Sequence, residues 1–403
     1  MREWKKVKLG ELYTVHNGLS KSKDFFGSGY PFLTFSNVFN NWFLPDKLDA
    51  LVESTDKDRE SFSIHKGDVF ITRTSETMDE LGMSSVALKD YPNATFNGFT
   101  KRLRPKSDDI LPEYIGYYLR SKKFRNKFLA FSSMTTRASL ANSDLLNMEV
   151  EVPVKNVQRN IANILLRYDS LIENYQKQIK LLEESAQRLY KEWFVDLRFP
   201  GHENTKIVDG VPEGWAKKRI NEFASILSGY AFKSSTFEEN GYYNIVTIKN
   251  VQNGFFEGKR LNHIRKLPPG MPQHCLLNTG DLLLSLTGNI GRVCMVIGKN
   301  NLLNQRVAKI ESKYPAFVYC LFRSNSMFTA INNLGNGAAQ QNVSPIRIGE
   351  LEIIFANDEI ISNFEKITSN IRKQILLLHS KINLLSEARD RLLPKLMSGE
   401  IEV

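Results

Sequence analysis

Apolar residues recur at heptad spacing in two long stretches of this chain. Residues 157–194 contain neither Gly nor Pro, and their apolar side chains fall on two seam positions of an amphipathic helix. Residues 358–393 repeat this pattern at a constant offset of 203. The first seam comprises Ile161, Leu165, Tyr168, Ile172, Tyr175, Ile179, Leu182 and Leu189, and the second comprises Phe364, Ile371, Ile375, Leu378, Ile382, Leu385 and Leu392.

The ends of both stretches carry helix boundary signals. Asn156 and Asn357 are suitable N-caps, and Pro394 predicts the end of the second helix. Thr368 and Arg389 interrupt the second seam with polar side chains and are expected to weaken it. A single amphipathic helix would normally pack against its own domain, but two matched stripes predict a coiled coil of the two helices.

Chain topology fixes the direction of this pairing. The first helix leads from one part of the chain to the next and the second leads back, which predicts an antiparallel pair. About 35 helical residues span roughly 50 Å, against about 34 to 36 Å for one turn of B-DNA. We therefore expect the helices to hold two modules at a separation that suits two major grooves on one face of a duplex.

The segments beside the helices form an internal repeat. Asn37-Val38 returns as Asn250-Val251 and Gly67-Asp68 as Gly280-Asp281, in the same order. Short apolar runs predict strands at 69–72 and 282–285, while 113–120 and 316–323 predict helices, one or two per module. The predicted fold is α+β, with two pseudo-symmetric α/β domains separated by two long antiparallel helices. The expected parts are module one at 1–155, the central helix at 156–196, a linker at 197–214, module two at 215–356 and the C-terminal helix at 357–403.

Charge and composition narrow the choice of partner. The chain has 403 residues, a net charge of +10 and a pI near 9.3, which favours an anionic partner such as nucleic acid or a membrane surface. Charge that only maintains solubility is the alternative. No apolar run reaches the roughly 18 residues of a membrane span, and the start does not resemble a signal peptide. Cys275, Cys294 and Cys320 are interpreted as reduced core cysteines of a cytoplasmic protein.

Three polar loops in each module are candidates for contacts with double-stranded DNA. Arg suits guanine, Asn and Gln suit adenine, and Ser or Thr suits bases or phosphate, while Lys neutralises phosphate. For any one of these residues an ordinary turn or surface role remains the alternative, and Gly18 and Gly229 are expected to serve turn geometry. The candidates are Lys21, Lys23, Arg73, Thr74, Ser75, Asn97, Lys101, Thr135, Thr136 and Arg137 in module one, and Lys233, Lys249, Thr287, Asn289, Arg292, Asn304, Gln305, Arg306, Gln340, Gln341 and Asn342 in module two.

Motifs for catalysis are missing from the sequence. There is no Asn-Pro dipeptide of the kind an adenine methyltransferase motif contains, and no Gly-x-x-x-x-Gly-Lys-Ser/Thr phosphate loop. The six histidines show no metal-ligand spacing. We therefore expect no catalytic residue, no metal site and no cofactor in this chain, so that any chemistry comes from partner subunits.

Three segments resemble one protein family. They are LYKEWFVDLRFPG at 189–201, VPEGW at 211–215 and RLLPKLMSG at 391–399. Together with the repeat, they make the whole chain similar to the specificity subunit of type I restriction-modification enzymes, which defend cells against foreign DNA. The resemblance implies two target-recognition domains that each read half of a bipartite DNA site. It also implies helices that act as spacer and docking surface for two modification (methyltransferase) subunits and for restriction subunits, with S-adenosylmethionine and ATP/Mg bound on those partners.

Two other classes remain open at the level of sequence. The first is a stand-alone bipartite DNA-binding regulator, and the second is a coiled-coil adaptor whose positive charge is incidental. An acidic DNA mimic is excluded by the charge. The bases recognised and the spacer length do not follow from the sequence, because recognition loops vary freely on such a framework.

Overall fold

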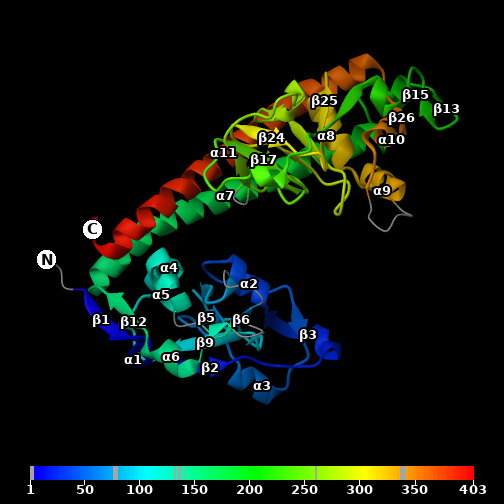
Figure 1. The fold of residues 1–403 in the computed structure, drawn as a ribbon. Helices are drawn as coiled ribbons and strands as arrows, with labels where there is room; N and C mark the ends of the chain where they lie inside the picture. Colours follow the sequence, from blue (N-terminus) through cyan, green and yellow to red (C-terminus); the bar gives the residue numbers. More distant parts are fainter. Residues whose placement is uncertain are drawn as a thin grey trace. The chain divides into compact units, whose positions relative to one another are not determined.

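The chain folds into two compact units in the computed structural model (Figure 1), residues 1–171 with 385–403 and residues 172–384. The structure describes residues 4–75, 80–130, 133–134, 138–139, 141–258, 261–335 and 342–403. Each unit combines one module with parts of both long helices. The predicted α+β class and the repeated organisation are confirmed.

Module one is built on an antiparallel four-stranded sheet in the order β2-β9-β5-β7. These strands are β2 (Tyr13–Asn17), β9 (Thr100–Pro105), β5 (Val69–Thr72) and β7 (Ser84–Val86). A second sheet contains β4 (Leu51–Val52), β3 (Phe26–Leu33) and β8 (Thr95–Phe96), and β1 (Lys5–Lys8) pairs with β12 (Glu149–Val152). The helices are α1 (Leu9–Leu12), α2 (Phe35–Asn40), α3 (Asp56–Ser61), α4 (Pro112–Arg120), α5 (Lys122–Ala130) and α6 (Asn142–Asn147).

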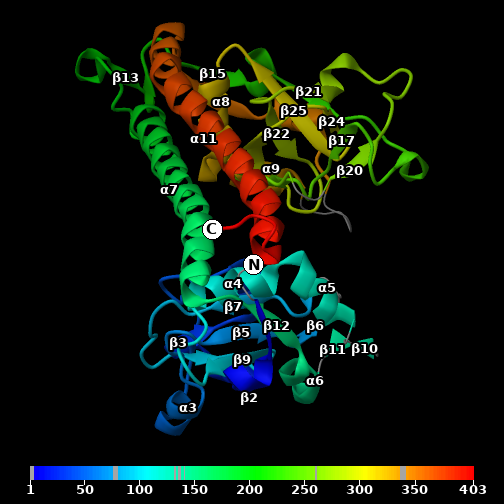
Figure 2. The ribbon, with the colours of Figure 1, turned by 90° about the vertical axis from the view of Figure 1, so that its left-hand side faces the viewer.

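Module two (Figure 2) repeats the order of the main sheet, whereas its second sheet has four strands and that of module one has three. Its main sheet contains β16 (Ala224–Ser228), β25 (Val307–Ser312), β22 (Leu282–Ser285) and β23 (Val293–Met295) in the order β16-β25-β22-β23. The second sheet has the order β20-β17-β24-β21, with β20 (Asn262–Ile264), β17 (Tyr243–Val246), β24 (Asn301–Leu303) and β21 (Leu276–Leu277). β15 (Ala216–Arg219) pairs with β26 (Glu352–Phe355), and β18 (Val251–Gln252) with β19 (Phe255–Phe256). The helices are α8 (Pro315–Arg323), α9 (Asn325–Leu334) and α10 (Pro345–Gly349), and a β13 (Ile207–Val208) and β14 (Val211–Pro212) hairpin lies in the linker.

The expectation of one or two short helices per module was wrong. The predicted α4 and α8 are present, but α5 and α9 follow them directly and α6 and α10 come later in each module. In α5 only Phe124 and Phe128 are buried. One apolar pair at i and i+4 is too short a periodic signal to distinguish a helix from a polar loop.

The repeated Gly-Asp pairs form the turns that lead into β5 and β22. Gly67 and Gly280 have φ of +90° and +96°, a region that favours glycine. The Asp68 carboxylate accepts from the His65 N–H at 2.8 Å, and the Asp281 carboxylate accepts from the Asn278 N–H at 2.8 Å. The repeat is therefore retained for backbone geometry.

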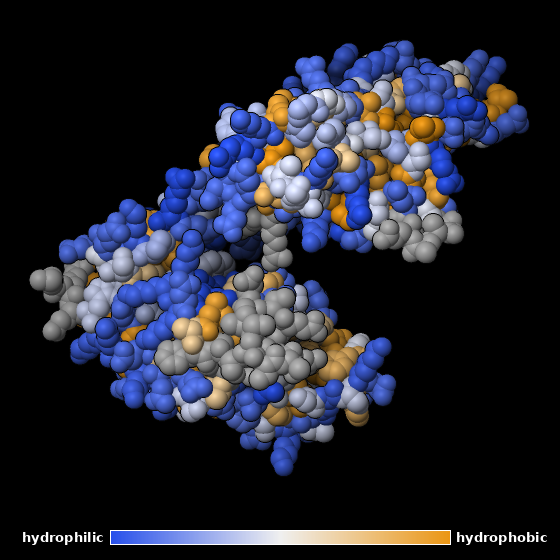
Figure 3. Space-filling model, in the orientation of Figure 1, coloured by the Kyte–Doolittle hydropathy of each residue, from blue (hydrophilic) through white to orange (hydrophobic). Residues whose placement is uncertain are grey.

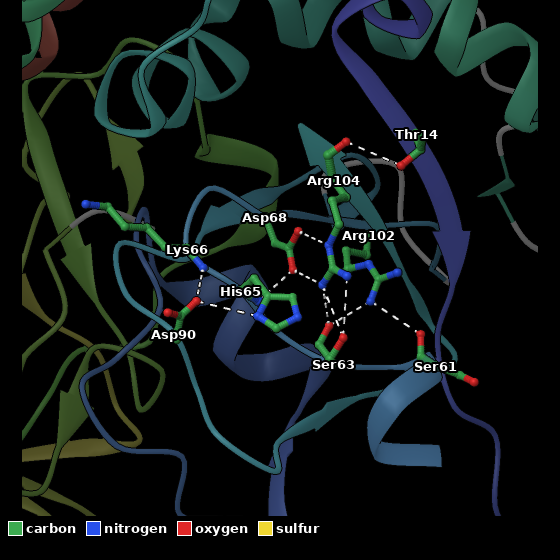
Figure 4. A network of polar contacts seen from close by, with 9 residues as sticks. All are labelled: Thr14, Ser61, Ser63, His65, Lys66, Asp68, Asp90, Arg102 and Arg104. Carbon is green, nitrogen blue, oxygen red and sulfur yellow. Dashed lines mark hydrogen bonds and ion pairs between the residues drawn. The ribbon is translucent and has the colours of Figure 1, made fainter. Parts of the chain in front are cut away.

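In module one Asp68 also anchors a network of polar contacts (Figure 4). Its fully buried carboxylate accepts from Arg104 Nε at 2.8 Å and Nη2 at 2.7 Å. Arg102 Nη1 donates to the Ser63 carbonyl at 2.7 Å. The loop before β5 is thereby tied to β9 through paired, hydrogen-bonded charges, which is the condition under which a charge is stable in the interior.

Gly18 and Gly229 allow two backbone segments to approach closely. A Cβ at Gly18 would lie 1.9 Å from the Asn97 carbonyl oxygen, and one at Gly229 would lie 2.2 Å from the Asn304 carbonyl oxygen. Neither glycine has a positive φ. The expectation that they serve turn geometry was therefore wrong. Glycine is required at both positions because any side chain would overlap the neighbouring backbone.

The two long helices are α7 (Lys155–Phe194) and α11 (Asp358–Ser398). In the second unit Trp193 packs on Phe364 at 5.7 Å between ring centroids, and the Lys381 ammonium lies 5.5 Å from the Tyr175 ring. In the first unit Asp169 is paired with Arg389. Residue numbers on α11 fall as those on α7 rise, which confirms the antiparallel prediction. All the predicted seam residues are buried or half-buried.

Two helix boundaries differ from the sequence prediction. The N-cap at Asn357 is confirmed, since its Oδ1 accepts from the Ile360 N–H at 3.0 Å. Asn156 is not a cap, because α7 begins at Lys155 and the Val154 carbonyl accepts the first helical hydrogen bonds. Pro394 lies inside α11 and does not end it. The turn around it buries Leu393, Leu396 and Met397 in the core of the first unit, which outweighs the lost hydrogen bond.

The polar seam residues Thr368 and Arg389 are buried and have partners. The Thr368 hydroxyl donates to the Phe364 carbonyl at 2.8 Å, and Arg389 donates to the carboxylates of Asp169 and Asp390. A buried polar group with its hydrogen bonds made costs little. The expectation that these residues weaken the seam overlooked these partners.

The face drawn in Figure 3 is largely hydrophilic, with separate apolar patches. Within the described ranges no helix is both long and apolar enough to cross a membrane. Cys275, Cys294 and Cys320 are free and buried, in agreement with their interpretation as core residues.

We predict that Gly229→Ala lowers the free energy of unfolding by about 2 to 3 kcal/mol, because the backbone must move to relieve the overlap. Chemical denaturation followed by circular dichroism measures the change. Gly258→Ala is the matched control in the same module, since a Cβ there meets only Phe256 ring atoms at 3.8 and 3.9 Å. Equal effects of the two substitutions would contradict this account of Gly229.

Candidate nucleic-acid interface

The three candidate loops of module one lie side by side. The Arg73 N–H donates to the Phe99 carbonyl at 3.0 Å, which joins the loop after β5 to the loop before β9. β6 (Thr74–Ser75) pairs with β11 (Ala138–Ser139), which pairs with β10 (Ser133–Met134). Thr135, Thr136 and Arg137 lie outside the described residues, as do the side chains of Thr74 and Ser75. Loops far apart in sequence thus form one surface.

Two basic side chains gather at this end of the main sheet. Lys101 on β9 lies opposite Asn17 on β2 and Ile71 on β5, and Arg73 Nη1 donates to Asn17 Oδ1 at 3.3 Å. Burial, and after it the charge of Arg73, lowers the pKa of Lys101 to about 8. Lys101 is only 5% exposed. Two positive charges held close together at the end of a sheet suit an anionic ligand.

The other two lysines of module one differ from each other. Lys21 is paired with Asp58 at 2.9 Å. The hydrogen bond from Lys21, helped by that from Thr55, lowers the pKa of Asp58 to about 2. Lys23 is exposed. The charge of Lys21 is therefore committed to the fold, whereas Lys23 faces solvent.

Module two assembles its loops in the same way. The Leu286 N–H donates to the Arg306 carbonyl at 3.0 Å, and the Val343 N–H donates to the Leu286 carbonyl at 2.9 Å. The Thr287 hydroxyl donates to Asn342 Oδ1 at 3.0 Å. Gln340 and Gln341 lie outside the described residues. The same three chain segments therefore meet in both modules.

The side chains offered by module two are mostly accessible. Arg292 is half-buried and donates to Gln252 Oε1. The exposed candidates are Lys233, Lys249, Asn289, Gln305, Arg306 and Asn342. Asn, Gln and Arg on adjoining loops supply the donor and acceptor pairs that read base edges.

Asn97 and Asn304 have structural duties at equivalent bends. Asn97 Nδ2 donates to the Leu33 carbonyl at 2.9 Å, and its Oδ1 accepts from the Phe99 N–H at 2.9 Å. Asn304 Oδ1 accepts from the Arg306 N–H at 3.3 Å. Both residues are less than 10% exposed. Their side chains therefore stabilise the conformation of the two loops.

Sequence analysis missed Asn17 and Gln252, which orient two candidate arginines. Asn17 contacts Arg73 and Gln252 contacts Arg292. Asn17 could have been found from the sequence, because it directly precedes the repeated Gly18. Gln252 has no comparable signal. Among the described residues no group of three His, Cys, Asp or Glu side chains could hold a metal ion.

Comparison with known proteins gives one family profile and two relatives that align over the whole chain. The sequence profile described as "Type I restriction modification DNA specificity domain" matches residues 1–184 and again 212–384, the two copies of the repeat. The MjaIX type I restriction enzyme specificity subunit of Methanocaldococcus jannaschii is 26% identical, covering 100% of this chain and 94% of that protein. The HindI type I specificity subunit of Haemophilus influenzae is 23% identical over 100% of both.

A solved structure shows a similar fold. The S subunit of a type I restriction-modification system from M. genitalium aligns with a TM-score of 0.57 at 16% identity, covering 98% of this chain and 96% of that one. At this identity the likeness concerns the fold. It supports the arrangement of repeated modules and long helices described above.

We predict that Lys101→Met keeps or raises the melting temperature at pH 7. Burial disfavours the charged form of Lys101, so the wild-type protein carries this penalty below pH 8. The unfolded chain holds the proton up to its ordinary pKa near 10.5, so wild-type stability rises between about pH 8 and 10.5. The difference between variant and wild type should shrink over that range in thermal melts. A variant that melts well below wild type at pH 7 would show that the charged amine stabilises the fold.

Proposed function

Because the chain belongs to the type I restriction-modification DNA specificity family, we propose that its modules are target-recognition domains that each read one half of a bipartite DNA site. The profile of that family covers both copies of the repeat. Each copy contains one complete module. A single chain with two such modules suits a target that consists of two separate sequences.

One observation carries the proposal: equivalent loops converge in both modules but present different side chains. Module one has the half-buried Arg73 and the largely buried Lys101 at these loops, and module two has the exposed Gln305, Arg306 and Asn342. Arg pairs bidentately with guanine, and Asn or Gln with adenine, so the two surfaces suit different half-sites. The net charge of +10 adds affinity for the DNA backbone.

The long helices are proposed to set the spacing of the half-sites and to dock partner subunits. In each unit, seam residues of both helices lie in the core, as expected for an antiparallel pair. Leu181, Leu377 and Leu384 are exposed by 65%, 47% and 67% in the second unit, which suits an apolar partner surface. The proposed partners are two modification (methyltransferase) subunits and restriction subunits. Catalysis, S-adenosylmethionine and ATP/Mg would reside on them.

No observation favours the stand-alone regulator or the structural adaptor. The relatives that match over the full chain are specificity subunits of restriction enzymes. Convergence of variable polar loops on a common framework is unexpected for a protein whose charge is incidental.

The function is tested by mapping methylated bases after incubating DNA with the chain and its methyltransferase partners. We expect methylation within one two-part sequence and no transfer by the chain alone. Arg73→Ala should relax specificity in one half-site, and Arg306→Ala in the other, each at a cost of about 1 to 3 kcal/mol in binding.

Each arginine variant serves as the control for the other. Melting temperatures near wild type confirm that both are folded. If both substitutions weakened all sequences alike, these arginines would be phosphate contacts and this assignment of base contacts would fail.

The spacing role is tested by inserting four residues into each long helix, between Leu171 and Ile172 and between Leu384 and Leu385. Both points lie at the boundary between the compact units. Each helix gains about 6 Å, near the rise of two base pairs, while its seam turns by about 40°. The assembled complex should then prefer targets whose half-sites lie about one or two base pairs further apart.

Two-residue insertions at the same points are the control. They turn each stripe by about 200° and should destabilise the helix pair. Methylation assays on targets that differ only in spacer length decide the outcome. An active four-residue variant with the original spacer preference would show that the helices do not measure DNA.

A further inference from the structure

Each module contacts α7 through a tyrosine and a carboxylate. In the first unit the Tyr117 hydroxyl on α4 donates to Asp169, which also accepts from Arg389. In the second unit the Tyr319 hydroxyl on α8 donates to Glu183, which also accepts from Arg323. We name these the Asp169 cluster (Tyr117, Asp169, Arg389) and the Glu183 cluster (Tyr319, Glu183, Arg323).

The two clusters are not copies of each other. At the offset of 203 that relates the helices, Asp169 corresponds to Arg372 and Glu183 to Ser386. The same offset relates α4 to α8 and places Tyr117 opposite Cys320. Different residues therefore make the same kind of contact in each unit. The two contacts were therefore not inherited from the duplication. Their separate presence indicates that each module requires a directional polar contact with α7.

Because the charged groups in these clusters are buried, the loss of their hydration offsets much of the stability that the contacts provide. The Glu183 and Arg323 side chains are only 12% and 16% exposed, and Tyr319 is 3% exposed. Burial raises the pKa of the Glu183 carboxyl, and the charge of Arg323 offsets part of that rise. Buried ion pairs often add no net stability over apolar residues, but removing one partner leaves an unpaired charge. Their best-attested benefit is the selection of one register.

The geometry of the Glu183 cluster permits one register along α7. Arg323 Nη1 also donates to the Tyr319 hydroxyl at 2.9 Å, so three polar groups are mutually bonded. A shift of α8 along α7 by one helical turn, about 5.4 Å, would break both bonds to Glu183, from the Tyr319 hydroxyl and from Arg323. Apolar packing is less selective, because one methyl group replaces another at small cost.

The second unit depends on its cluster more than the first. In the first unit the Trp42 ring lies 5.4 Å from the Arg120 guanidinium and 5.1 Å from that of Arg389, and so fills the joint. The corresponding Phe255 is 46% exposed, and a pocket of about 410 Å³ opens beside Glu183. With less packing around it, the Glu183 cluster is the more informative site for substitution.

We propose that the Asp169 and Glu183 clusters are positioning contacts that fix the register of each recognition module on the helix pair, and so help to set the separation of the two half-sites. This rests on the proposed function of the helices as a spacer. The residues touch neither DNA nor a reacting group and act through the placement of the modules.

The test uses the chain assembled with its methyltransferase partners and targets with the mapped spacer or one base pair more. Glu183→Gln should lower the ratio of methylation rates between the two targets about tenfold, because a buried charge loses its partner. Glu184→Gln is the matched control on the same helix, since Glu184 is exposed, and should change the ratio less than about twofold. The double variant E183Q/R323M removes both charges and should recover thermal stability while the ratio stays low.

The outcomes separate positioning from stability. A low ratio for both Glu183 variants, with a normal ratio for the control, supports the inference. A wild-type ratio in E183Q despite a lower melting temperature overturns it, as does a ratio restored to wild type in the double variant. A wild-type complex that methylates both spacers equally would contradict the spacer role of the helices, and this inference with it.

Discussion

The antiparallel seam between α7 and α11 is the constraint on which the rest of the structure depends. Trp193 packs on Phe364 in the second unit, and Asp169 pairs with Arg389 in the first. Because α11 returns along α7, the first unit combines residues 1–171 with residues 385–403 from the far end of the chain. Leu393, Leu396 and Met397 complete the core of that unit. Module one, α7 and α11 therefore share one hydrophobic core in the first unit.

On this frame the repeated residues serve the fold and the divergent ones remain available for recognition. Gly18, Asp68 and Asn97 are occupied by close backbone approach and internal hydrogen bonds, as are their counterparts in module two. Gln305 and Arg306 lie on loops whose backbones are fixed by neighbouring segments. Rigid support of variable side chains lets specificity change without loss of the fold. Burial lowers the pKa of Lys101 to about 8, so a positive charge at this position is disfavoured by the fold.

The sequence was sufficient for features set by periodicity and repetition. Five heptads in each long helix predicted the antiparallel pair, and β5 and β22 have the predicted bounds. Features set by tertiary contacts were not predictable. Pro394 is tolerated because its neighbours are buried, and Lys21 is occupied by Asp58, a residue 37 positions away. The convergence of the candidate loops also needed the structure, because it depends on backbone hydrogen bonds between segments without a sequence signature.

The placement of the buried polar contacts follows from the different demands on the two kinds of interface. Along the helix seam, apolar side chains supply most of the stability, and the heptad pattern itself specifies the register. Where a short helix such as α8 meets α7, two turns of apolar surface specify position weakly. The Glu183 cluster supplies there a contact that is satisfied in one arrangement only. Under the proposed spacer role, a fixed position of each module on the helices matters more than added stability, which accounts for charge buried where the modules meet α7.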